Sequence, residues 1–323
     1  VYNKLHHSLM DGVSGLRLLQ RTLSPDPTVR DAPPPWNLPR PAAPSRGSLL
    51  DLGSVVNQVR RTTGEVAGLV PAALKFARTV LTPHDLGVPY EAPRTMLNVP
   101  IGGARRFAAQ SWSLDRIHAV RRAARVSVND VVMAMCAGAL RLYLEEHNGL
   151  PDAPLVAMVP VSLRAEDDTS DGGNSVGVTL CNLATHLADP AKRLGAISAS
   201  MAQGKEIFQG LTPIQALAWS AINISPLALT PIPGFVRFTP PPFNVIISNV
   251  PGPRERMYWN GSRLDGLYPA SVVLDGQALN ITLTSNAGNL DFGVIGCRRS
   301  VPSLQRILTH LETSLGELEA ALL

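Results

Sequence analysis

Hydrophobic positions recur at helical spacing in several separate stretches of the chain. Val13, Leu16, Leu19 and Leu23 fall on one face of a helix predicted over residues 12–23. Ser113 and the Ser127–Asp130 stretch carry side chains that cap helix N-termini, so each is expected to start a helix. The pattern predicts further helices over residues 49–81, 114–125, 128–146, 191–208 and 302–322.

Shorter runs rich in β-branched and aromatic residues alternate with these helices. Turn signals at Asn260–Gly261 and Asp275–Gly276 separate several of the runs in the last third of the chain. Mixed strands with helices on one side predict an α/β sandwich. The predicted strands cover residues 1–5, 107–113, 155–163, 175–187, 243–249, 256–259, 268–274, 279–284 and 290–297.

Proline divides the chain into three parts. Residues 24–46 are proline-rich around Pro33–Pro35, which is typical of an extended linker. We therefore predict an N-terminal lobe remnant over 1–23, linker and crossover helices over 24–100, and a C-terminal lobe over 101–323. A strand at Val1–Leu5 needs neighbours for its backbone groups. This leads us to expect an upstream segment that was cleaved, is carried on a separate chain or is missing from the sequence.

Composition narrows the class of protein. With 45% hydrophobic and 17% charged residues, the 323-residue chain can bury a sizeable core. Its net charge of +4 comes without a dense Lys/Arg run or aromatic–basic interleaving, which argues against nucleic acid as a partner. The cysteines are three, widely spaced and within apolar runs, so we expect buried free thiols rather than disulfides or a metal site.

One long apolar stretch leaves two interpretations open. Residues 211–236 carry no charge, but four prolines interrupt the stretch, so a single membrane-spanning helix is not expected. It is either a buried helix followed by a proline-rich loop, or a lipid-facing interfacial patch.

The clearest chemistry lies near the start of the chain, in the stretch His6-His7-Ser8-Leu9-Met10-Asp11-Gly12. Imidazole titrates near neutral pH, so a histidine suits the removal of a hydroxyl proton during acyl transfer. A nearby carboxylate can fix local geometry, and a glycine allows a tight turn. Taken alone, the pattern is equally compatible with surface or metal-binding histidines.

Further short motifs occur downstream in a fixed order. They are Asn129–Asp130, residues 158–164 (Met-Val-Pro-Val-Ser-Leu-Arg), Gly173–Asn174, residues 247–253 (Ile-Ser-Asn-Val-Pro-Gly-Pro) and residues 275–281 (Asp-Gly-Gln-Ala-Leu-Asn-Ile). Together with the histidine motif, they make the chain resemble the bacterial wax ester synthase/acyl-CoA:diacylglycerol acyltransferase family, and the mycobacterial triacylglycerol synthases in particular. The resemblance runs from the first residues to the last helix.

The resemblance implies a two-lobed fold like that of chloramphenicol acetyltransferase and condensation domains, with the N-terminal lobe incomplete in this chain. It implies that His7 is the general base, that His6 supports it, and that Asp11 orients the loop. Gly12 would allow the turn into the next helix. The hydroxyl would attack acyl-CoA directly, with no acyl-enzyme, no metal and no cofactor beyond acyl-CoA as substrate.

Other residues have both a structural and a functional interpretation. Asn129 is either part of a helix cap or shapes the active site, and Ser248 and Asn249 either aim a donor into a cleft or simply end a strand. Arg164 either meets a CoA phosphate or pairs with a carboxylate. Residues 291–295 read Asp-Phe-Gly-Val-Ile where relatives in the superfamily often carry Asp-Phe-Gly-Trp-Gly, so this turn is not expected to be built like theirs.

The function implied is O-acyl transfer from acyl-CoA to diacylglycerol, a long-chain alcohol or both. The alternatives are a non-catalytic lipid- or acyl-CoA-binding module and a condensation-type acyltransferase with another acceptor. The expected partners are acyl-CoA, the lipid acceptor, a membrane or lipid-droplet surface and the missing N-terminal segment. We expect a cytoplasmic protein, with peripheral attachment to the inner membrane or to lipid inclusions.

Overall fold

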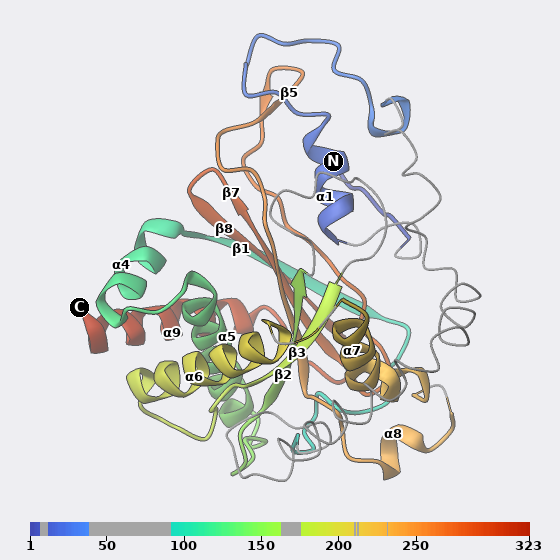
Figure 1. The fold of residues 1–323 in the computed structure, drawn as a ribbon, viewed down its shortest axis with the longest axis vertical. Helices are drawn as coiled ribbons and strands as arrows, with labels where there is room; N and C mark the ends of the chain where they lie inside the picture. The colour runs from blue at the N-terminus through green and yellow to red at the C-terminus, as the bar shows by residue number, and fades with distance from the viewer. Residues whose placement is uncertain (7–11, 39–91, 163–175, 210, 212, 231) are drawn as a thin grey trace.

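A single six-stranded mixed sheet organises the chain (Figure 1). The computed structural model describes residues 1–6, 12–38, 92–162, 176–209, 211, 213–230 and 232–323. The strands lie in the order β1-β8-β7-β4-β2-β3, with β2–β4 and β4–β7 parallel and the other pairs antiparallel. Their bounds are β1 Arg105–Ser113, β2 Val156–Ser162, β3 Val176–Asn182, β4 Val245–Val250, β7 Leu279–Asn286 and β8 Asn289–Cys297.

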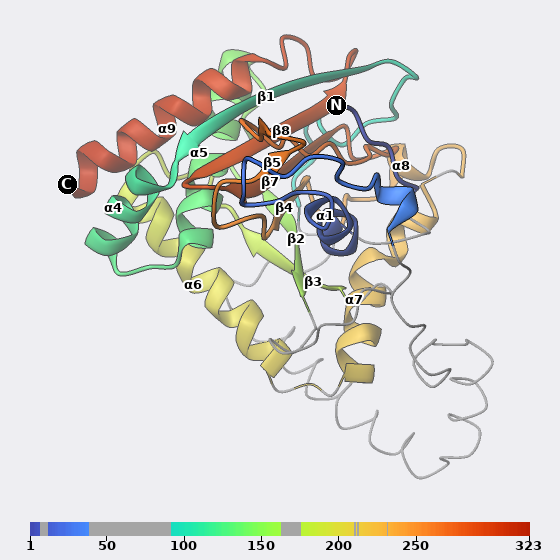
Figure 2. The ribbon, with the colours of Figure 1, turned by 90° about the horizontal axis from the view of Figure 1, so that it is seen from above.

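Helices cover the two faces of the sheet unequally. Four helices form a layer on one face, whereas α1 and α7 lie on the other side (Figure 2). The four are α4 Leu114–Ala124, α5 Val128–Glu146, α6 Pro190–Gln209 and α9 Arg306–Leu322. The others are α1 Gly12–Gln20, α7 Pro213–Ala228, the short α8 Phe235–Phe238 and the 3₁₀ turn η1 Pro35–Asn37. The α/β architecture with a mixed sheet is therefore confirmed.

Alternation along each strand sends its side chains to two different cores. On β4, Val245 and Ile247 join the main core with α5 and α9, while Ile246 packs against a smaller cluster that includes Leu227 of α7. Because successive strand residues point to opposite faces, Ser248 and Val250 share the face of Ile246. The end of β4 therefore presents them on the side away from the four-helix layer.

Local capping rules predicted two helix starts correctly. The Ser113 side chain accepts a hydrogen bond from the Asp115 backbone N–H at the start of α4. At the start of α5, Ser127 Oγ accepts from Asp130 N at 3.1 Å, and Asp130 Oδ2 accepts from Ser127 N at 2.9 Å. Both bonds satisfy N–H groups that the first helical turn leaves without partners.

Two strand predictions are wrong. Residues 1–5 form no strand, and Val1 and Tyr2 are 97% and 84% exposed. Residues 268–274 also form no strand, since Leu274 makes only an isolated bridge with Gln277 across the Asp275–Gly276 turn. A strand needs a neighbouring strand along its length, and hydrophobic composition alone does not supply one.

Other boundaries moved by a few residues. The predicted strand at 256–259 is part of a small hairpin, in which β5 Tyr258–Trp259 pairs with β6 Ser262–Arg263 through the predicted Asn260–Gly261 turn. Both turn residues have positive φ, 49° and 81°, which asparagine and glycine tolerate. The predicted helix over 49–81 lies outside the described residues, and the domain boundaries remain predictions.

The apolar stretch after residue 211 forms α7 and the loop leading to α8. Leu227 packs on the smaller core, whereas Leu229, Ile232 and Phe238, which follow the helix, are exposed. Contact of this stretch with lipid stays a prediction. Among the described residues, no single helix is long and apolar enough to cross a membrane; α4 and α5 reach that length and composition only together, bent by 103°.

The cysteine prediction holds. Cys136, Cys181 and Cys297 are all free and buried. Burial raises the pKa of the Cys136 and Cys181 thiols to about 12, so both remain protonated at neutral pH.

An ion-pair cluster joins the end of α5 to α9, and it predicts a pH dependence. Glu146 accepts a hydrogen bond from His310 Nε2 at 2.9 Å and pairs with Arg306 at 3.0 Å. Both contacts lower the pKa of Glu146, and the hydrogen bond from His310 has the larger effect. A carboxylate with a lowered folded-state pKa stabilises the fold above its unfolded pKa, and this is lost as pH falls through the folded value. Glu146→Gln should therefore lower the melting temperature at pH 7 but not well below pH 4. An equal decrease at both pH values would contradict this assignment.

Candidate active site

The histidine motif ends where α1 begins, directly beside the carboxyl end of β4. Gly12 is the first residue of α1, and a Cβ atom placed on it would lie 3.5 Å from Val250 Cγ2. Two motifs more than 230 positions apart in the sequence therefore meet. This is the contact at which a site built from both motifs can form.

The end of β4 is held by its parallel neighbour β7. Ser248, Asn249 and Val250 pair in register with Thr282, Leu283 and Thr284. The hydroxyl of Thr284 donates to the Val250 carbonyl oxygen at 2.7 Å. Pairing with β7 therefore fixes the backbone of Ser248 and Asn249, whose side chains are half-buried, just before Val250, which lies beside the start of α1.

Gly252 closes this corner, and a larger residue there should disturb it. A Cβ atom at residue 252 would overlap the Ser285 carbonyl oxygen, and the Gly252 N–H donates a hydrogen bond to Ser285 Oγ at 2.9 Å. Gly252→Ala should destabilise the fold by about 1–3 kcal/mol and reduce acyl transfer by pushing the end of β4 away from β7. Thermal unfolding and a transfer assay check both effects.

The matched control is Gly316→Ala in α9, where nothing lies within 4 Å of the added methyl group. Replacing glycine by alanine in an open helical position should leave activity unchanged and stabilise slightly. Wild-type transfer by folded Gly252→Ala would show that this corner does not shape the site.

A buried polar row runs along β7 on the same face as Ser248. Its members are under 7% exposed, although alternation of apolar and polar residues usually marks a solvent-facing side. They are Asn280, Thr282, Thr284 and Asn286. The alternation is visible in the sequence. That the polar side is enclosed follows only from the strand register and from residues 267–268, which lie over this face.

Asp291 of β8 anchors the chain that covers this face. Its fully buried carboxylate accepts hydrogen bonds from Ser111 Oγ at 2.6 Å, Leu267 N at 2.6 Å and Asn286 Nδ2 at 3.0 Å. The Ser111 hydroxyl also lies 3.0 Å from the Tyr268 hydroxyl. The network ties residues 267–268 to three strands, which explains how an aspartate remains buried.

The chain after α1 is fastened to the β5–β6 hairpin. Ser24 and Tyr258 exchange two backbone hydrogen bonds of 2.9 and 2.7 Å, and Ala32 N donates to Asn260 Oδ1 at 2.7 Å. Since β4 leads into this hairpin, one segment of chain contacts the start of α1 and also holds the residues that follow the helix.

The predicted site residues fall into three groups. At the α1–β4 contact, Gly12 meets Val250, and Ser248 lies two residues earlier on the same face of β4. Asn249 is adjacent in the strand, but alternation turns its side chain toward the four-helix layer. His6 is exposed and lies nearby in sequence. Asn129 lies in the first turn of α5, which packs on the opposite face of the sheet, and its neighbour Asp130 completes the capping box. The remaining predictions, His7, Asp11 and Arg164, lie outside the described residues.

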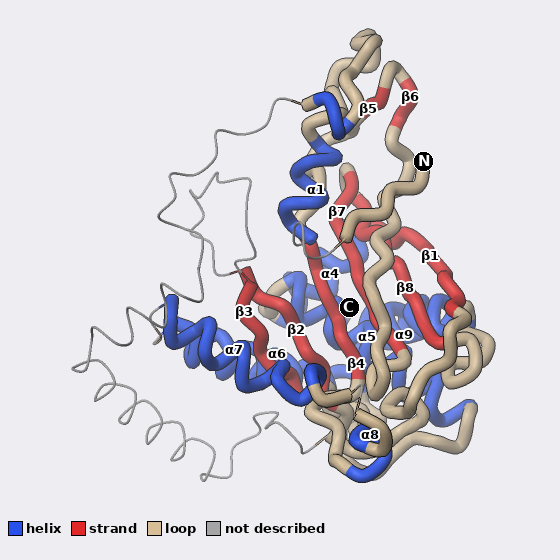
Figure 3. The backbone as a smooth tube through the Cα atoms, turned by 90° about the vertical axis from the view of Figure 1, so that its right-hand side faces the viewer, coloured by secondary structure: helices blue, strands red, loops and turns tan. Residues whose placement is uncertain are grey.

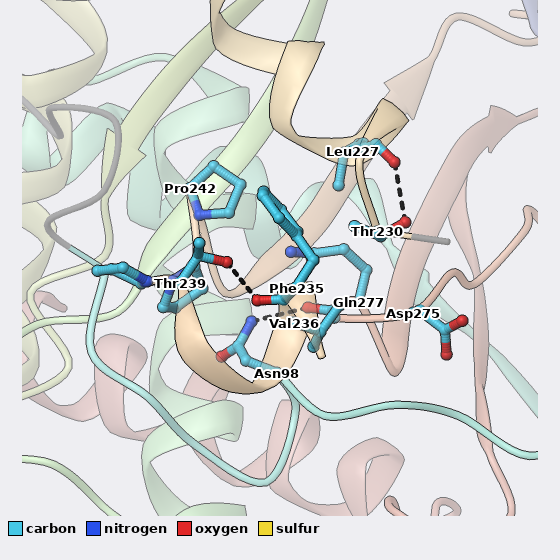
Figure 4. A pocket seen from close by; sticks show the side chains of 12 residues that line it. Asn98, Leu227, Thr230, Phe235, Val236, Thr239, Pro242, Asp275 and Gln277 are labelled. Carbon is cyan, nitrogen blue, oxygen red and sulfur yellow. Dashed lines mark hydrogen bonds between the residues drawn. The ribbon is translucent and has the colours of Figure 1, made fainter. Parts of the chain in front are cut away.

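A separate hollow lies at the other end of the sheet. It is open to solvent and is lined by α8, the end of α7 and the Asp275–Gly276 turn, together with Asn98 and Gln277 (Figure 4). α1 and α8 lie at opposite ends of the sheet (Figure 3). The nine residues of β8 span about 30 Å, so this hollow is not part of the α1–β4 site.

No group of three or more histidine, cysteine, aspartate or glutamate side chains within the described residues could hold a metal ion.

Comparison with known proteins identifies the family. The wax ester synthase/diacylglycerol acyltransferase catalytic domain matches residues 1–132, and the C-terminal domain of the same family matches residues 172–319. A Mycobacterium tuberculosis protein named as a probable diacylglycerol O-acyltransferase is 57% identical over 99% of this chain and 70% of its own length. The chain belongs to the wax ester synthase/diacylglycerol acyltransferase family. It is therefore an O-acyltransferase, as the sequence predicted.

Two more distant members of the family support the same assignment. The O-acyltransferase WSD of Acinetobacter baylyi is 43% identical over 98% of this chain and 69% of its own length. The solved wax ester synthase/diacylglycerol acyltransferase of Marinobacter aquaeolei VT8 superposes with a TM-score of 0.72 at 41% identity, covering 98% of this chain and 67% of that protein.

Proposed function

We propose that this protein transfers a long-chain acyl group from acyl-CoA to the hydroxyl of diacylglycerol, of a long-chain alcohol or of both. The relatives' names support these acceptors, since they include diacylglycerol O-acyltransferases and a wax ester synthase. The observation that carries the proposal is the contact between Gly12 and Val250, because it joins the histidine motif to the Ser-Asn-Val-Pro-Gly-Pro motif.

In the proposed reaction His7 acts as general base. Its neutral imidazole removes the proton of the acceptor hydroxyl while the oxygen attacks the thioester carbonyl carbon. A tetrahedral oxyanion forms, the C–S bond breaks, and the CoA thiolate takes up the proton to leave as CoA-SH. The products are one ester and one CoA, with no acyl-enzyme between them.

The other residues of the motif have supporting roles in this proposal. His6 supports the base, Asp11 orients the loop, and Gly12 allows the turn into α1. Ser248, on the same face of β4 as Val250, would contact substrate beside this turn. Asn249, on the other face of the strand, and Asn129 would act from the side of the helix layer. Arg164 would meet a CoA phosphate. No cofactor beyond the acyl-CoA substrate is needed.

We propose that the protein is cytoplasmic. Because diacylglycerol and long-chain alcohols are insoluble in water, the proposed reaction takes place at the surface of the inner membrane or of lipid inclusions.

Radiolabelled palmitoyl-CoA offered with diacylglycerol and with hexadecanol in parallel tests the proposal. Labelled triacylglycerol, wax ester or both is the expected product, and their ratio gives the acceptor preference. Stoichiometric binding of acyl-CoA without any ester would instead indicate a binding module. Amide or carrier-bound products alone would indicate condensation-type chemistry.

A further inference from the structure

Exposed arginines gather along the end of the sheet that lies farthest from α1. We call this surface the arginine edge, and all of its arginines are exposed. It extends from α8 to the corner formed by the start of β1 and the end of β8 (Figures 1 and 3). Its members are Arg94, Arg105, Arg106, Arg237, Arg298 and Arg299.

Backbone contacts fix the corner of this surface. β1 and β8 pair with Arg105 opposite Cys297, and Arg298 N donates to the Ala104 carbonyl oxygen at 3.0 Å. The Arg299 guanidinium donates to the Pro100 carbonyl oxygen at 3.1 Å, and that of Arg105 donates to the Gly102 carbonyl oxygen. Two arginine pairs from distant parts of the sequence therefore project from one corner.

The other end of the edge is joined to this corner by residues 92–104. Arg94 donates to the carbonyl oxygens of Val236 and Thr239, which flank Arg237 at α8. Further along, Ala278 N bonds to Leu97 O at 2.8 Å and Gly276 N to Val99 O at 3.1 Å. Residues 92–104 therefore link the α8 end of this edge, with Arg94 and Arg237, to the corner that carries the other four arginines.

The arginine edge holds the whole positive excess of the chain. Within its described segments, residues 92–106, 235–243, 274–277 and 297–301, Asp275 is the only acidic residue. The chain has 29 basic and 25 acidic residues, so 23 basic and 24 acidic residues remain elsewhere. Such a concentration of one sign on one surface attracts a polyanion.

Exposed apolar side chains accompany the charge. Ile232 is 53% exposed and lies on the stretch 211–236, which has no charged residue; Phe238, directly after Arg237, is 80% exposed. The Arg237 guanidinium carbon lies 5.9 Å from the centre of the Phe238 ring. Arginines beside protruding apolar groups suit the boundary between headgroups and acyl chains of an anionic bilayer. Phosphate-rich polymers such as nucleic acid offer no such apolar layer.

We propose that the arginine edge binds anionic phospholipid headgroups, with Phe238 and Ile232 entering the acyl boundary. The edge lies at the opposite end of the sheet from α1, so it anchors the protein and does not take part in acyl transfer. Only the purpose of this anchoring rests on the proposed function, because lipid binding itself requires no catalysis.

Co-sedimentation of the full chain with vesicles tests the anchor. We expect binding to vesicles of phosphatidylcholine mixed with phosphatidylglycerol, weak binding to phosphatidylcholine alone, and loss of binding at high salt. R298Q/R299Q should weaken binding by about 30-fold. The matched control is R121Q/R122Q, a second adjacent pair of exposed arginines, on α4, and it should bind as the wild type does. F238S tests the apolar contribution and should also weaken binding.

Activity separates the anchor from the proposed chemistry. R298Q/R299Q should esterify detergent-dispersed diacylglycerol at the wild-type rate, but act more slowly on diacylglycerol presented in anionic vesicles. Equal binding to both vesicle types, or an equal loss in both arginine pairs, would overturn the proposal. The proposal would also be overturned if Arg298 and Arg299 were needed for binding of free CoA or DNA but not for binding of anionic vesicles. A wild type that binds vesicles but makes no ester would overturn only the proposed function.

Discussion

Replacing His7 by alanine is expected to reduce acyl transfer by about 10²–10⁴-fold, which is the usual contribution of a well-placed general base. The free energy of unfolding should change little, because the loss is chemical. Steady-state transfer from acyl-CoA to diacylglycerol and circular dichroism measure the two effects. His6→Ala is the neighbouring control, and since His6 is expected only to support the base, its activity should fall less.

The pH dependence of transfer adds a second check on His7. A general base must be neutral to accept a proton, so the wild-type rate should fall as pH decreases below the ordinary range of imidazole. Substantial turnover by a correctly folded His7→Ala variant, with an unchanged pH profile, would rule out this base.

Removing the Asp291 carboxylate should produce the largest loss of stability in the described structure. Asp291→Ala leaves the donors on Ser111, Leu267 and Asn286 without their buried acceptor. The Ser111 hydroxyl keeps the Tyr268 hydroxyl as a partner, so two donors lose theirs. At about 1–3 kcal/mol for each buried donor without a partner, a total of at least about 2 kcal/mol is expected. Urea unfolding measures this change directly.

Asp265→Ala provides the control for Asp291. Asp265 is an exposed carboxylate whose ion pair with Arg263 lies at the surface, and such pairs contribute less than about 1 kcal/mol. Similar losses of stability in both variants would mean that the Asp291 network does not hold residues 267–268 on the sheet. We also expect Asp291→Ala to lower activity, because that segment covers the polar row of β7.

Local rules explain which parts of the fold could be predicted from the sequence. The Ser127–Asp130 capping box and the Ser113 cap depend on residues three or fewer positions apart, and both were predicted correctly. Strands at 1–5 and 268–274 were predicted from hydrophobic composition, but neither has a partner strand in the described structure. Partner choice depends on distant residues, which periodicity alone does not show.

The same distinction applies to the site. The family resemblance named Gly12, Ser248 and Asn249 as candidate site residues, and the contact of Gly12 with Val250 brings the two motifs that contain them together. The Asp291 network was not predicted, although Asp291 itself was noted, because it requires the register of β1, β8 and β7 and the path of residues 264–273. Hydrogen-bond partners from three strands leave no local pattern in the sequence.

The most direct test of direct acyl transfer at His7 follows labelled acyl-CoA with and without acceptor. With diacylglycerol or hexadecanol present, the wild type should release CoA and form ester in equal amounts, and His7→Ala should do neither at a comparable rate. Without acceptor, no label should remain on the denatured protein. Label that remains on the denatured protein would contradict direct transfer. Release of CoA without ester, at the same rate in the wild type and in His7→Ala, would contradict the role of His7.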